Sequence, residues 1–139
     1  MNQATYEDVN LILRLYEIRR EEKLRAARLW YVTNFKPKTL ADMNALCGPG
    51  TEANPLFRQA LSYWDMVASF ITAGVLNEEL FFQSNRELLF FWIRLKPVIE
   101  EVRTVFGPKA YKNLETVAES YAKYLGPETY EGFAARVLA

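Results

Sequence analysis

Asp65 is the polar residue whose surroundings most suggest chemistry, because it lies in the otherwise apolar run from Tyr63 to Val67. A buried carboxylate without a partner is costly, so this side chain needs an ion pair, hydrogen bonds or water. It either fixes the register of two packed helices, with Arg94 and Arg103 as candidate partners, or lines a pocket and has a perturbed pKa. We favour the first interpretation and predict a buried or half-buried ion pair between Asp65 and Arg103.

The other candidates for catalysis or metal binding are incomplete. Ser120 and Lys123 match the Ser-x-x-Lys pattern of penicillin-recognising enzymes, but the two partner motifs of that family do not occur in the sequence. Glu115 and Glu119 share a helix face, yet di-iron bundles also use histidine, and the chain has none. The single cysteine, Cys47, therefore has no histidine with which to form a reactive thiolate pair. We expect no catalytic residues, no metal and no cofactor.

The charge balance does not favour nucleic acid as a partner. Seventeen basic residues cancel seventeen acidic ones, so no net field attracts a polyanion. None of the six glycines begins a phosphate-binding loop. Basic residues do gather near the N-terminus, but they are spread around the predicted helix, which is typical of a solvated or partner-facing surface. They are Arg14, Arg19, Arg20, Lys23, Arg25 and Arg28.

Helical periodicity runs through most of the 139 residues, half of which are hydrophobic. The pattern predicts one long helix from about Tyr6 to Phe35 that projects beyond the body of the protein. A short helix from Thr39 to Leu46 and a Gly-Pro-Gly loop follow. Asn54 is expected to cap the next helix, which is apolar on two faces and therefore central to the core. Gly74 is expected to end it.

A second apolar stretch begins at Asn77 and continues to Phe106, with a kink expected at Pro97. Two Gly-Pro pairs, at Gly107 and Gly126, each indicate the end of one helix and the start of the next. No segment alternates apolar and polar residues, so no sheet is expected. The predicted fold class is all-α: a single domain over residues 1–139, built as a bundle of five or six helices with a long N-terminal helix.

Several helix-packing motifs stand out when they are taken together: Leu61–Asp65, Gly74–Leu80, Trp92–Ile99 with Arg103, and Tyr111–Glu115. The set is similar to the bacterial domain-of-unknown-function family numbered four-seven-six-zero, which implies an all-helical fold and no established activity. Many members begin with a membrane-spanning helix, whereas the first helix predicted here is charged. The resemblance places Asp65 and Arg103 at an acidic and a basic motif position, which makes their pairing more plausible.

Aromatic residues predict a surface for a protein partner. They cluster on several faces of one region, more than a single buried stripe requires, and the alternative is that they simply fill the core. The first hypothesis is therefore a non-enzymatic helical interaction module whose partner is a protein, with a homodimer as one form. The candidate surface comprises Trp30, Tyr31, Phe81, Phe82 and Phe90.

The second hypothesis is a small-molecule sensor or enzyme, with a pocket between helices around Asp65, Tyr63 and Trp64. A closed, dry core around Asp65 would remove this hypothesis. The sequence shows no secretory signal, and its apolar runs are shorter than the ~20 residues that span a bilayer. We therefore expect a cytoplasmic protein without a membrane span.

Overall fold

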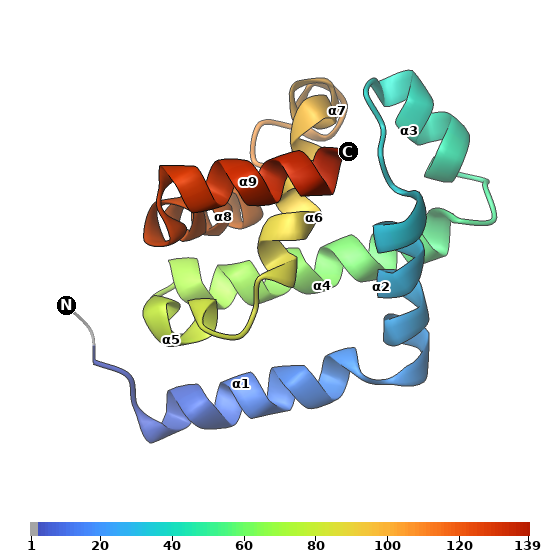
Figure 1. The fold of residues 1–139 in the computed structure, drawn as a ribbon. Coiled ribbons are helices and arrows are strands. Elements are labelled where there is room, and N and C mark those ends of the chain that lie inside the picture. Colours follow the sequence, from blue (N-terminus) through green and yellow to red (C-terminus); the bar gives the residue numbers. More distant parts are fainter. Residues whose placement is uncertain (1–2) are drawn as a thin grey trace.

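The computed structural model describes residues 3–139, which form helices joined by turns, with no strand among them (Figure 1). The all-α class is confirmed, but five or six helices is too few, because two of the long helices predicted from the sequence are divided. In chain order the helices are α1 (Tyr6–Arg19), α2 (Glu22–Asn34), α3 (Leu40–Cys47), α4 (Asn54–Thr72), α5 (Glu78–Phe82), α6 (Glu87–Leu95), the 3₁₀ turn η1 (Lys96–Val98), α7 (Ile99–Phe106), α8 (Lys112–Leu125) and α9 (Pro127–Leu138).

The expected long N-terminal helix is two helices that run in different directions (Figure 1). The break lies at Glu21, whose backbone leaves the helical region and whose carboxylate accepts a hydrogen bond from the Leu24 N–H, so that it caps α2. α2 then packs against α4 and buries Ala27 and Tyr31 completely. The prediction of a projecting helix is therefore wrong. The bend lets α2 bury its apolar side chains against the core, whereas a straight helix would leave them in solvent.

α4 is central to the core, as its two apolar faces predict. Leu61, Trp64 and Ala68 are completely buried, and α2 and α8 are its main neighbours. Gly74 ends this helix with a positive φ of 78°, a conformation that glycine adopts without steric cost. The expected cap is wrong: Asn54 is the first helical residue, and its side-chain amide donates to the Cys47 carbonyl at 2.8 Å.

The apolar stretch from Asn77 to Phe106 is three helices. Asn77 caps α5 as the sequence predicts, but α5 ends after little more than one turn. α6 follows and is buried on nearly every face. At Pro97 the 3₁₀ turn η1 separates α6 from α7, which confirms the position of the expected kink. Within residues 3–139, no helix combines the length and apolar character needed to cross a bilayer.

Candidate functional site

Asp65 and Arg103 do not pair in the structure. Asp65 is half-buried on α4, and its Oδ1 accepts a hydrogen bond from the Leu114 backbone N–H at 3.2 Å. Arg103 on α7 donates from Nη2 to Glu115 Oε1 at 2.8 Å and from Nε to the Ala110 carbonyl at 3.0 Å. Two separate links thus replace the predicted ion pair, and both tie neighbouring helices to the start of α8.

Asp65 supplies a helix cap that the local sequence lacks. The N-cap position of α8 is Tyr111, whose side chain makes no capping hydrogen bond. The first N–H groups of a helix have no partner within it, so the Leu114 N–H needs an acceptor from elsewhere. Asp65 provides this acceptor from α4, and a carboxylate is favoured there by the helix dipole. The absence of a capping residue before Lys112 is the sequence signal that could have revealed this role.

Burial raises the pKa of the Asp65 carboxyl above its ordinary value of 3.8, and the hydrogen bond from Leu114 lowers it by less. A raised pKa means that folding favours the protonated form. The carboxyl therefore lowers the stability of the fold at pH values above its folded pKa. That unfavourable contribution decreases as the pH falls through the folded pKa, and it is gone below the ordinary value of 3.8.

Asp65→Asn tests this assignment. Asparagine retains an oxygen that can accept from the Leu114 N–H but carries no charge, so the free energy of unfolding at pH 7 should stay equal or rise. Its pH dependence just above pH 3.8 should become flatter, which urea denaturation at several pH values measures. Asp65→Ala, which removes the acceptor, should cost about 1 kcal/mol. A large loss for Asp65→Asn at pH 7 would show that the charge has a favourable partner.

Arg94, the other predicted partner of Asp65, binds backbone carbonyls instead. Its guanidinium is almost completely buried and donates to Val137 at 2.7 Å, to Phe35 at 2.9 Å and to Val32 at 3.3 Å. These carbonyls belong to the C-terminal ends of α2 and α9, which carry the negative end of the helix dipole. Arg94 therefore joins three helices at one buried point.

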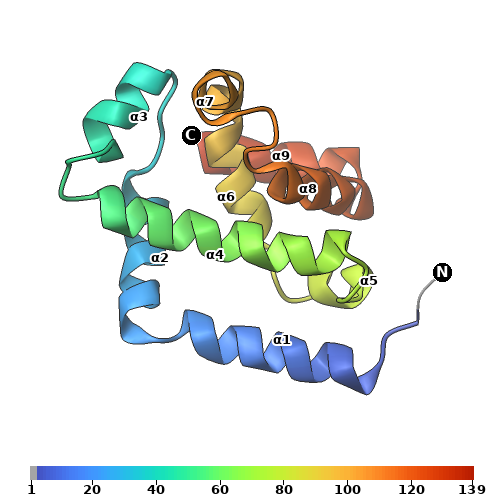
Figure 2. The same cartoon turned by 180° about the vertical axis from the view of Figure 1, so that it is seen from behind.

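A pocket of about 540 Å³ lies beside Asp65. It is formed where α3, α4, α7 and the α7–α8 connection meet, and both views place α3 and α7 at the same end of the molecule (Figures 1 and 2). Apolar walls come from side chains that include Phe57, Val102 and Phe106, while Arg58 and Lys109 supply positive charge. Neither Tyr63 nor Trp64 lines this pocket, so only the Asp65 part of the predicted lining is placed there.

Tyr111 brings unusual backbone geometry to this pocket. Among the residues described, Tyr111 is the one non-glycine residue with a positive φ, which is 58°. Backbone strain of this kind is common at functional sites. Burial, with a smaller contribution from the nearby Asp65 charge, raises the pKa of the Tyr111 hydroxyl to about 12. Burial likewise raises the pKa of the Cys47 thiol to about 11, so this cysteine stays protonated at neutral pH and is a poor nucleophile.

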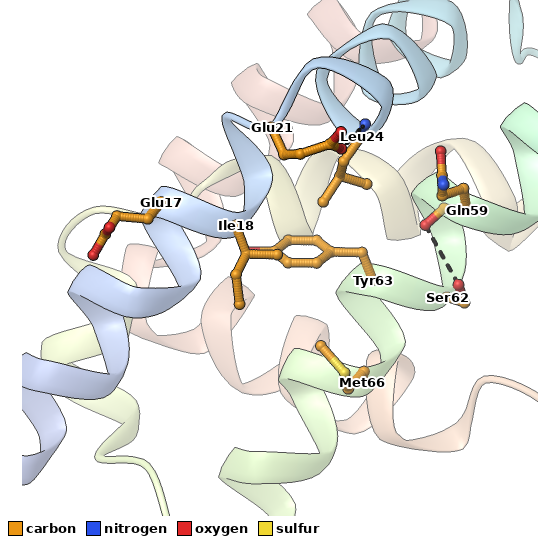
Figure 3. Close-up of a pocket in the computed structure, with 8 residues that line it drawn as sticks. All are labelled: Glu17, Ile18, Glu21, Leu24, Gln59, Ser62, Tyr63 and Met66. Atoms are coloured by element: carbon orange, nitrogen blue, oxygen red, sulfur yellow. Dashed lines mark hydrogen bonds between the residues drawn. The ribbon is translucent and has the colours of Figure 1, made fainter.

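A second, more open hollow of about 560 Å³ lies between the α1–α2 junction and α4 (Figure 3). The Tyr63 ring lies beside Ile18, and its hydroxyl donates to the Leu15 carbonyl at 2.8 Å. Leu24 and Met66 add apolar surface, and the Glu21 carboxylate is occupied in capping α2. The Ser62 hydroxyl is likewise engaged locally, because it donates to the Gln59 carbonyl.

The aromatic surface predicted from the sequence is mostly core. Tyr31, Phe81 and Phe82 are buried, while Trp30 and Phe90 are partly buried and packed against the core. Tyr31, for example, stacks on the Phe91 ring at 3.8 Å and donates its hydroxyl to the Phe91 carbonyl. These aromatics fill the interior of one chain, so the three buried ones cannot form a partner surface.

A row of exposed apolar side chains that the sequence analysis missed lies on α1. Tyr6, Val9, Leu13 and Tyr16 are all exposed, Tyr6 by 81%. The opposite side of α1 faces the body of the protein, where Leu15 is buried. The sequence signal for this row was the spacing of its four residues, which follow one another by three, four and three positions. This spacing places all four side chains along one side of a helix.

The fold and its pocket define a small all-α domain with one hydrophobic core. Residues 4–121 match the family model described as Domain of unknown function (DUF4760), and the chain belongs to that family. The resemblance seen in the packing motifs is thereby confirmed. Neither the curated proteins nor the solved structures contain a significant match to the chain.

Proposed function

We propose that this protein is a helical interaction module that pairs with a second copy of itself through the exposed face of α1. The observation that carries this proposal is the row of Tyr6, Val9, Leu13 and Tyr16, four large apolar side chains left in solvent along one side of a helix. Contiguous exposed apolar surface of this kind marks interaction sites on soluble domains.

The spacing of this row favours a helix as the partner. Apolar residues separated alternately by three and four positions form the seam along which two α-helices pack. A capping box stabilises the start of the helix that carries the row, where Thr5 and Asp8 exchange hydrogen bonds. A folded helix with an open apolar seam needs no rearrangement before it binds.

An antiparallel two-fold arrangement suits a second copy. It would set Tyr6 against the partner's Tyr16 and Val9 against the partner's Leu13, so that one surface is complementary to itself. It would also bring Glu7, near the start of each α1, close to Arg20 at the end of the other.

Leu13→Glu tests the proposal. Two-fold symmetry would place two new carboxylates near the centre of the seam, so self-association should weaken by at least about tenfold. Light scattering at about 100 μM should show a dimer for the unaltered protein, and on dilution the dimer of the variant should dissociate at a concentration at least about tenfold higher.

Leu29→Glu is the matched control, because Leu29 is comparably exposed but lies on α2. This variant should remain dimeric, and circular dichroism should show both variants to be folded. A monomer for the unaltered protein at this concentration would contradict the proposal. A monomer for Leu29→Glu alone would place the interface on α2 instead.

A further inference from the structure

We infer that the pocket beside Asp65 is a binding site for an amphipathic organic anion, a carboxylate or phosphate group attached to an apolar chain or ring. The pocket has the size and character of small-ligand sites, which are mostly apolar with a few placed polar groups. It is built from α3, α4, α7 and the connection after α7, and it includes no residue of α1. The inference is thus independent of the self-association proposed above.

The positive charge at this pocket is available to a ligand. Arg58 and Lys109 are both exposed and line the pocket, and neither forms an ion pair or side-chain hydrogen bond with any described residue. Arginine and lysine are the side chains that bind carboxylate and phosphate groups. Two such groups at one pocket favour an anionic head group.

The carboxylate in the pocket does not cancel this charge. Asp65 lies seven residues after Arg58 on α4, about 10 Å farther along the same side of the helix. Its Oδ1 is engaged with the Leu114 N–H. The two positive charges that line the pocket therefore outnumber its one carboxylate.

The apolar part of the ligand has a surface to cover. Phe106 lines the pocket but is 67% exposed, although it is a large aromatic side chain next to the buried Val102. Phe57 forms another apolar wall from α4. A chain or ring that enters between these side chains would remove the Phe106 ring from water, which is favourable in proportion to the apolar area buried.

The test compares four probes of equal chain length: octanoate, octyl phosphate, octanol and octylammonium. Binding is followed by calorimetry and by shifts of the Cys47 and Tyr111 amide signals in nuclear magnetic resonance. At least one anionic probe should bind about tenfold more tightly than octanol, and octylammonium should bind most weakly. Comparison of octanoate with octyl phosphate identifies the preferred head group.

Two variants and one control link the effect to the pocket. The double variant Arg58→Gln/Lys109→Gln should reduce the affinity for the anions to that for octanol. The control, Lys23→Gln/Lys123→Gln, has the same change in net charge and should keep its affinity for the anions. Asn44→Trp, which places a bulky ring at the pocket lining, should weaken all the probes that bind. Equal affinity for octanol and the anions, loss of anion affinity in the control, or no binding of any probe would overturn the inference.

Discussion

Replacing Arg94 by methionine is expected to lower the free energy of unfolding by about 3 kcal/mol, because two buried carbonyls and one partly buried carbonyl lose their hydrogen-bond donor. The acceptors are the carbonyls of Val32 and Phe35 at the end of α2 and of Val137 at the end of α9. Methionine fills a similar volume but donates nothing. Urea denaturation followed by circular dichroism measures the loss.

Arg25→Met is the matched control for this variant, because Arg25 is exposed on α2 and should change stability by less than about 0.5 kcal/mol. Arg94→Lys should recover only part of the loss. Arginine reaches the carbonyls of two helices with the several donors of its rigid planar guanidinium, and the single ammonium group of lysine cannot do so. A loss below about 1 kcal/mol for Arg94→Met would show that water or a local shift satisfies these carbonyls.

Replacing Glu87 by leucine is expected to cost about 2–3 kcal/mol, because one carboxylate holds three helices together. Its Oε2 accepts from Arg28 Nε at 2.6 Å and from Trp64 Nε1 at 3.1 Å, and its Oε1 accepts from Arg28 Nη2 at 3.0 Å. The third guanidinium nitrogen of Arg28 donates to the Arg19 carbonyl at 3.0 Å, which extends the network to the end of α1. The variant leaves the buried Trp64 N–H without its acceptor.

A double-mutant cycle with Arg28→Met and Glu87→Leu measures how strongly this pair is coupled. We expect a coupling energy of about 1 kcal/mol, because the pair is bidentate but partly exposed to solvent. The same cycle on Lys112 and Glu115 is the control, since their contact is 3.5 Å long and Lys112 is largely exposed. That coupling should stay below about 0.5 kcal/mol. Equal coupling energies for both pairs would mean that the bidentate geometry of Arg28 and Glu87 does not strengthen their interaction.

Local patterns were sufficient to predict the elements whose causes are themselves local. The apolar faces of α4, the turn at Pro97 and the helix ends at Gly74, Gly107 and Gly126 all follow from residue type and spacing. The all-α class and the family followed in the same way.

The break between α1 and α2 could not be predicted, because nothing local requires it. Arg19, Arg20 and Glu21 are residues that helices accommodate well. The bend is decided by contacts remote in sequence, such as the stack of Tyr31 on Phe91 and the hydrogen bonds of Arg28. Periodicity describes one helix at a time and contains no information on these contacts.

The partners of Asp65 and Arg103 were hidden for a related reason. The sequence shows that each side chain needs a polar partner, but backbone groups are absent from any pattern of residue types. Asp65 binds the Leu114 N–H and Arg103 binds the Ala110 carbonyl, and each depends on where α8 begins. The aromatics were misplaced similarly: Phe82 is buried because Tyr121 of α8 stacks on it at 4.2 Å.

The few contacts that attach α1 to the body allow this helix to unfold separately from the core. Long-range hydrogen bonds tie it to the body: Asp8 accepts from the Asn77 N–H, Leu15 accepts from the Tyr63 hydroxyl, and Arg19 donates to Asn85. Leu15 is its one buried apolar side chain. A helix held by so little apolar contact can open while the core stays folded, so its amide hydrogens should exchange together and earlier than those of α4 and α6. If two copies pair through α1, every opening that separates the pair, including this one, becomes rarer as the protein concentration rises.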